Sequence, residues 1–142
     1  SGSAGVAALA AKTKYSITYA EKSFADANKL KIAAIGNAAG NFTLPTSPAV
    51  SAFLGDATVD ATKGFFTFNY QTKEPGAYTL GIVSYMLVDT NYADKTKAAA
   101  VKQLANYLAS EDCTGGSNAS LGYVVIDGKL KAVAEAQIKK IG

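Results

Sequence analysis

The sequence has no arginine, histidine or tryptophan among its 142 residues. Arginine is the preferred side chain for bidentate phosphate recognition, and histidine is the commonest metal ligand and the usual base at neutral pH. The familiar phosphate, zinc and catalytic-triad sites therefore lose their best residues, and we expect neither a metal nor a cofactor. The net charge of +3 comes from 14 lysines spread along the chain without a basic stripe. That distribution argues against nucleic-acid binding.

Cysteine and long apolar runs are also scarce. Cys113 is the only cysteine, so the sequence excludes an intrachain disulfide, a cysteine cluster and a cysteine–histidine nucleophile. Its polar neighbours favour a small residue in a loop over a thiol that pairs with a partner or a missing segment. The longest apolar stretch, residues 80–88, is interrupted by glycine and polar residues. It is far shorter than the roughly 20 residues of a membrane helix, and it predicts a buried strand.

Residues 2–21 combine a glycine-bracketed helix start, a short apolar helix, a polar turn and a strand that ends in an acid. Serines near the start can cap the helix, and apolar residues follow at helical spacing. Beyond the turn, Tyr15, Ile17 and Tyr19 alternate with polar residues, as in a half-buried strand. We expect the two tyrosines to pack in the core. A helix followed so closely by a strand is one unit of an α/β sheet.

The rest of the chain alternates predicted helices and strands, which indicates an α/β domain. Helices are expected over 22–28, from Ser47-Pro48 onward, over 95–109 and over 130–141. Strands are expected over 30–35, 64–70 and 78–88. Ser47 is the predicted cap of the helix that begins with Pro48, and Asp94 is the predicted cap of the next one. Pro75-Gly76 marks a turn and a boundary between two lobes.

The opening stretch resembles a segment of the phosphate-binding proteins that serve bacterial ABC-type phosphate importers. Those proteins carry a glycine-rich turn leading into G-V-A-A, which residues 5–8 match. Further along they carry a strand of the type S-I-G-Y-V-E, which residues 16–21 match with Thr18 in place of the glycine. Later matches follow in the family's order at 23–25, 28–30, 32–37, 39–40, 76–80, 83–85 and 120–123. The resemblance therefore runs nearly from end to end.

The resemblance implies part of a type II periplasmic-binding-protein fold, with portions of two α/β lobes whose mixed sheets are flanked by helices. Residues 1–71 would be part of the second lobe, 72–79 the crossover or hinge, and 80–142 the part that completes the first lobe. In this family the anion lies between the lobes. The implied function is capture of phosphate and its delivery to an ABC permease in the membrane. It is non-catalytic and extracytoplasmic, either periplasmic or at the cell surface.

Most of the family's anion site has no match in this sequence. The family uses backbone amides at helix starts, hydroxyl groups, an arginine in an R-x-x-x-S-G-T motif, and an aspartate that accepts a phosphate proton. The arginine motif and the amino-terminal threonine loop are not found here, so we expect the anion-holding residues to precede Ser1 in a longer protein. Ser1, Gly2 and Ser3 resemble the S-G-T loop and could donate amides and hydroxyls to an oxyanion. A helix cap is the simpler interpretation.

Ala77, Tyr78 and Thr79 match the crossover region and are the hinge candidates, although the start of a buried strand is the simpler interpretation. A chain that holds only portions of two lobes leaves sheet edges without neighbours. We therefore expect a missing amino-terminal half, or a second chain, to cover those edges.

Two other functional classes stay open. A surface module with a structural or adhesive role could keep the same fold and bind no anion. A hydrolase could use paired carboxylates, such as Asp56 with Asp60 or Glu111 with Asp112, but solvated charges explain such pairs more simply. Non-catalytic phosphate binding is therefore our interpretation of the sequence.

Overall fold

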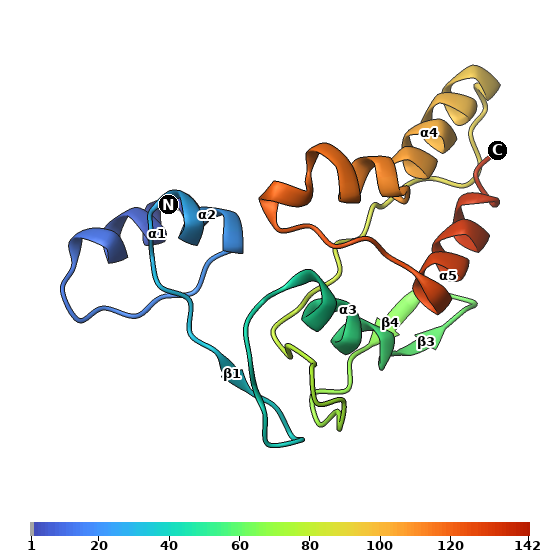
Figure 1. Ribbon diagram of the computed structural model, residues 1–142. Coiled ribbons are helices and arrows are strands. Elements are labelled where there is room, and N and C mark those ends of the chain that lie inside the picture. The colour runs from blue at the N-terminus through green and yellow to red at the C-terminus, as the bar shows by residue number, and fades with distance from the viewer. Residues whose placement is uncertain (1) are drawn as a thin grey trace.

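A computed structural model describes residues 2–142, apart from the side chain of Ser117 (Figure 1). The α-helices are α1 (Gly2–Lys12), α2 (Lys22–Ala27), α3 (Ser47–Gly55), α4 (Lys95–Leu108) and α5 (Gly128–Ile138). Two short irregular turns of helix follow α4, namely η1 (Asp112–Ser117) and η2 (Ala119–Leu121). The strands are β1 (Ile35–Gly36), β2 (Phe42–Thr43), β3 (Thr58–Asp60) and β4 (Phe65–Thr67). No helix within residues 2–142 has both the length and the apolar character needed to cross a bilayer.

Helix α4 forms where the sequence predicts it. Asp94 Oδ1 accepts hydrogen bonds from the amide of Thr96 at 2.8 Å and from the next amide at 3.1 Å. The carboxylate thereby takes up two amide groups that have no partner inside the helix. Ala98 and Ala105 are the buried residues of this helix. The predicted cap is thus confirmed, whereas the apolar residues Leu104 and Leu108 of the same helix are exposed.

Helix α3 confirms a predicted helix but corrects its predicted cap. Thr46, not Ser47, is the N-cap residue, and its hydroxyl accepts a hydrogen bond from the amide of Ala49 at 3.4 Å. The backbone of Thr46 is extended (φ −85, ψ 154), which is the conformation that lets a capping hydroxyl reach an amide in the first turn. Ser47 is already helical, and Pro48 occupies the first turn as expected.

The strand predicted at residues 15–19 is wrong. Tyr15 has a left-handed backbone (φ 62), and the segment joins α1 to α2 without regular structure. The side chains of Tyr15, Ile17 and Tyr19 are 92%, 95% and 93% exposed, so the tyrosines do not pack in the core. Alternating residues show which face a strand would bury. A strand also needs a neighbour to take its backbone hydrogen bonds, and this segment has none among the described residues.

The described sheet structure consists of two antiparallel ribbons. β1 pairs with β2, and β3 pairs with β4 so that Val59 lies opposite Phe66. The strand predicted at 64–70 is confirmed over β4, whereas the one predicted at 30–35 is paired only at Ile35. Residues 78–88 form no strand. The α/β class is therefore confirmed as a mixture of helices and strands, but the described residues build no mixed sheet.

The hydrophobic core lies among α3, β4 and α5, which Figure 1 shows grouped together. Its buried members are Phe53, Leu54, Ala77 and Leu130. The ring of Phe53 lies 5.5 Å from that of Phe68 and 5.6 Å from that of Tyr70, centroid to centroid. Burial of one such aromatic side chain stabilises a fold by about 1.5–3 kcal/mol. The core joins residues from both sides of the segment 72–79.

Polar contacts near its carboxyl end hold α5 against its neighbours. Lys102 Nζ, from α4, donates a hydrogen bond to the carbonyl oxygen of Ile141 at 2.9 Å, and Gln137 Nε2 donates to that of Ala61 at 2.9 Å. A lysine at this place also offsets the negative end of the helix dipole. Helices α1 and α2, in contrast, lie apart from α3, α4 and α5 in Figure 1. Helix α2 contacts η2.

Candidate functional site

The start of α1 holds two of the residues predicted to contact an anion, while Ser1 lies outside the described residues. Gly2 begins the helix with φ 71. The hydroxyl of Ser3 hydrogen bonds to the carboxylate of Glu21, which holds the pKa of Glu21 below its ordinary value. Glu21 is also the N-cap residue of α2. A carboxylate beside a helix start competes with an incoming anion for the positive end of the dipole, and the anion role of Gly2 and Ser3 stays a prediction.

The three hinge candidates lie in a segment with several anchors. Ala77 and Thr79 are buried, and burial raises the pKa of the Tyr78 hydroxyl. The amide of Tyr78 donates a hydrogen bond to the carbonyl oxygen of Ala49, in α3, at 2.9 Å. The hydroxyl of Thr43, in β2, donates to the carbonyl oxygen of Ala77 at 2.9 Å. Residues 77 and 78 are therefore bonded to both α3 and the β1–β2 ribbon.

Asn37 also fastens the β1–β2 ribbon to the turn before the hinge candidates. Its Nδ2 lies 3.0 Å from the carbonyl oxygen of Pro75 and 3.1 Å from that of Ala77. Its Oδ1 accepts hydrogen bonds from the amides of Ala39 and Asn41, both at 3.1 Å. One side chain thus closes the turn of its own ribbon and binds a segment about forty positions further along. No local sequence pattern indicates this distant contact.

A mostly apolar cavity of about 330 Å³ lies between β2, the start of α3 and Gly76. Its lining consists of small or uncharged residues, including Thr43, Thr46 and Ala49. The hydroxyl of Thr43 is engaged with Ala77, and that of Thr46 caps α3. This lining offers no charged group to an anion, so the cavity has none of the chemistry of a phosphate site.

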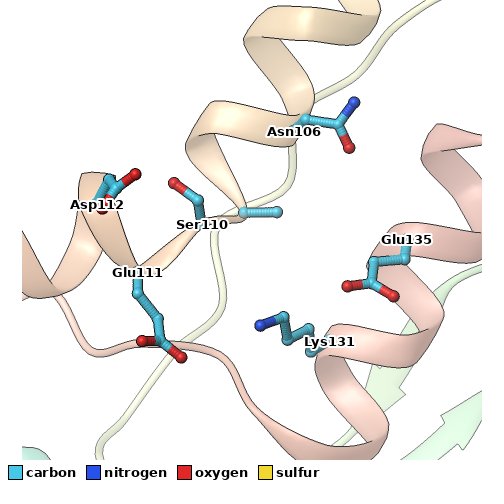
Figure 2. Close-up of a pocket in the computed structure, with 7 residues that line it drawn as sticks. Asn106, Ser110, Glu111, Asp112, Lys131 and Glu135 are labelled. Atoms are coloured by element: carbon cyan, nitrogen blue, oxygen red, sulfur yellow. The ribbon is translucent and has the colours of Figure 1, made fainter.

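Figure 2 shows another cavity, of about 230 Å³, between the end of α4 and α5. Glu111, Asp112 and Glu135 line it together with Lys131 and uncharged residues. Three carboxylates against one ammonium group repel phosphate at neutral pH. In the part of the chain that the structure describes, no group of three or more histidine, cysteine or acidic side chains is placed to hold a metal ion.

The carboxylates of Asp56 and Asp60 have structural partners. Hydrogen bonding from the side chain of Thr72, and then from that of Asn69, holds the pKa of Asp56 below its ordinary value. Asp60 Oδ1 accepts hydrogen bonds from the amides of Thr62 and the following residue, at 3.0 and 3.1 Å, and so closes the β3–β4 turn. These contacts fit local stabilisation of turns rather than paired acid and base catalysis.

Comparison with curated proteins links the chain to bacterial phosphate-binding proteins. It is 30% identical over 146 residues to "Phosphate-binding protein PstS 3" of Mycobacterium tuberculosis (strain ATCC 25618 / H37Rv) and to the protein of that name in Mycobacterium bovis (strain BCG / Pasteur 1173P2). It is 31% identical over 140 residues to the Mycobacterium leprae (strain TN) protein. The chain is a homologue of part of these phosphate-binding proteins. The resemblance predicted from the sequence is therefore confirmed.

The phosphate-binding relatives are much longer than the region of similarity. The match covers 99% of this chain but 39% of the M. tuberculosis protein, and 92% of this chain but 36% of the M. leprae protein. No protein-family model matches the chain, and no solved structure matches it significantly. The chain thus spans about two fifths of the length of the relatives it matches.

Proposed function

We propose that this chain is part of the substrate-binding component of an ABC-type phosphate importer. The observation that carries the proposal is the similarity to phosphate-binding proteins over 99% of the chain. In the whole protein two lobes would close over the anion, remove its water, and present the closed form to a membrane permease outside the cytoplasm. Residues 1–71 are proposed as part of one lobe and 80–142 as part of the other, joined by 72–79 as the crossover.

The charged groups of the chain fit a non-catalytic role in which other residues hold the anion. There is no arginine in the sequence, and the charged residues that line the cavity in Figure 2 are three acids and one lysine. A helix start can bind an anion through its amides, but the start of α1 already has the Glu21 carboxylate beside it. We therefore assign most of the phosphate ligands to the polypeptide that the relatives carry outside the matched region.

Calorimetric titration with phosphate tests this function. The protein to use is a hybrid in which this chain replaces the matched region of the M. tuberculosis phosphate-binding protein. The hybrid is expected to bind phosphate, and the chain alone is expected not to bind it, with sulfate as the control anion. Absence of phosphate binding by a folded hybrid, while the parent protein binds, would overturn the proposal.

A surface module without anion binding is the second candidate function. The observation that favours it is the large number of exposed apolar and aromatic side chains, among them Ile17, Tyr19 and Ile82, since exposed apolar surface marks interaction sites. A hybrid that folds and binds no phosphate would favour this candidate. Turnover of a phosphate ester by the hybrid would instead indicate an enzyme.

A further inference from the structure

Two segments of the chain have strand-like sequences but no strand neighbours. Between described residues, no backbone hydrogen bond involves the amides or carbonyls of residues 17–20 or 80–88. Unpaired backbone groups are tolerated only while water reaches them. Apart from the Tyr19 carbonyl oxygen, which accepts a long hydrogen bond of 3.5 Å from the Thr18 hydroxyl, each segment therefore presents a row of donors and acceptors without a backbone partner. Such a row is the feature that lets a strand be added.

The second segment also has the side-chain pattern of a strand covered on both faces. Ala77, Thr79 and Gly81 are buried, and a methyl group added at Gly81 would lie 3.2 Å from both Phe53 and Val50. Leu80 and Ile82, on either side of Gly81, face outward and are apolar as well, whereas Tyr78 is half-buried. Leu80 is 61% exposed and Ile82 is 75% exposed. A strand that is apolar on both faces is typical of a sheet with cover on each side, and here the outer face has no cover.

The total solvent-accessible surface area is larger than a compact chain of this mass would expose. A compact monomer of 14.6 kDa exposes about 6,900 Å², whereas this chain exposes 9403 Å². The excess of roughly 2,500 Å² is about three times the 800 Å² that one partner contributes to a standard protein interface. Figure 1 shows that this surface is divided, because residues 13–21 lie beside α1 and α2 whereas the stretch between β4 and α4 runs past α3.

We propose that residues 17–20 and 80–88 are docking segments for strands supplied by the polypeptide that the phosphate-binding relatives carry outside the matched region. This inference rests on the proposed function and adds to it the two places where the remaining polypeptide attaches. A symmetric dimer of this chain uses one self-complementary patch, and it does not fit two separate segments. One long polypeptide that crosses both segments does fit, and the relatives have the length for it.

The chemistry of the docking strands follows from the residues they meet. The main chains of the docking strands hydrogen bond to the free amides and carbonyls of the two segments. Alternate side chains of the docking strands pack on the exposed apolar side chains of those segments. Ile17 favours a β-branched or aromatic residue opposite it, and Ile82 favours the same. A lysine at either position puts a solvated charge into the new contact and opposes docking.

Hydrogen exchange measured by mass spectrometry tests the docking segments in the hybrid protein described above. In the chain alone, amides of 17–20 and 80–88 are expected to exchange close to the unprotected rate. In the hybrid they are expected to slow by about 100-fold or more. Ile17→Lys and Ile82→Lys should each remove the protection at their own segment. Tyr123→Lys, at an exposed residue outside both segments, is the matched control and should leave the protection in place.

Three results would overturn the proposal. The first is protection of both segments in the dilute monomeric chain, which means that they are paired within the chain. The second is protection that rises with concentration together with a dimer in light scattering, which identifies a second copy as the occupant. The third is absence of protection in the hybrid and also in a mixture of this chain with the unmatched part of the relative. Phosphate titration of the same hybrid separates the two proposals, because docking without phosphate binding contradicts only the proposed function.

Discussion

Replacement of Asn37 by alanine is expected to be among the most damaging changes outside the apolar core. The side chain makes two close contacts through Nδ2, to the carbonyl oxygens of Pro75 and Ala77, and accepts two hydrogen bonds through Oδ1. A hydrogen bond contributes about 0.5–1.5 kcal/mol net. Four of them sum to about 2–6 kcal/mol, and water replaces part of the loss because Asn37 is half-buried. We expect Asn37→Ala to lower the free energy of unfolding by about 2–3 kcal/mol.

Asn37→Asp separates the donor contacts of the Asn37 side chain from its acceptor contacts. The carboxylate keeps an acceptor for the amides of Ala39 and Asn41, but it loses both donors and places a negative charge against the carbonyls of the 74–77 turn. Those carbonyls raise the pKa of the introduced carboxyl group, since the protonated form can donate a hydrogen bond to one of them. The raised pKa means that stability is present below the ordinary carboxyl pKa and is lost as the pH rises through the folded-state value. The variant should therefore approach the parent chain in acid and fall below it at neutral pH.

Urea unfolding followed by circular dichroism measures these effects, and amide exchange locates them. Exchange at Tyr78 should speed up in both variants, whereas exchange at Asn41 should speed up only in Asn37→Ala. Asn106→Ala is the control, because Asn106 Nδ2 makes one local bond to the Lys102 carbonyl oxygen in α4. It should change stability by less than about 1 kcal/mol. An Asn37→Ala variant within about 0.5 kcal/mol of the parent, with Tyr78 exchange unchanged, would refute the reasoning.

Two further changes test other contacts. Thr72→Val removes the main hydrogen bond that lowers the Asp56 pKa. A lowered carboxyl pKa gives stability that is lost as the pH falls through the folded-state value, so the variant should lose less stability between about pH 5 and pH 2 than the parent. An unchanged dependence of stability on pH would contradict this assignment. Gly81→Ala places a methyl group 3.2 Å from two core side chains and should cost about 1–3 kcal/mol in urea unfolding. Gly76→Ala, where no atom lies within 4 Å, is its control and should be near neutral.

The helices show how much of the fold can be predicted from local sequence. The cap at Asp94 and the apolar spacing after it place α4 to within a residue, because a helix satisfies its backbone groups within four positions along the chain. The cap of α3 shows the limit of the same reasoning, since Thr46 and Ser47 are both good capping residues. The backbone angles decided between them, and the sequence does not contain those angles.

The predicted strands show the opposite case. Within the predicted strand 64–70, residues 65–67 form β4 because β3 lies close by in sequence and pairs with it. Residues 15–19 and 78–88 carry equally strong patterns and stay unpaired among the described residues. The alternation of apolar side chains gives each segment a preferred face, but it does not supply the neighbour that a ladder needs.

The candidate site divides in the same way. The order of short motifs along the chain was enough to indicate phosphate-binding relatives, because such an order depends on sequence alone. The hydrogen bonds of Asn37 to the 74–77 turn could not be predicted, because they join groups almost forty positions apart. The sequence by itself determined the helices, several of their ends and the relationship to other proteins. The tertiary structure alone decided which segments pair, which carbonyls Asn37 binds and which apolar faces stay exposed, because each depends on groups that are distant in the chain and close in space.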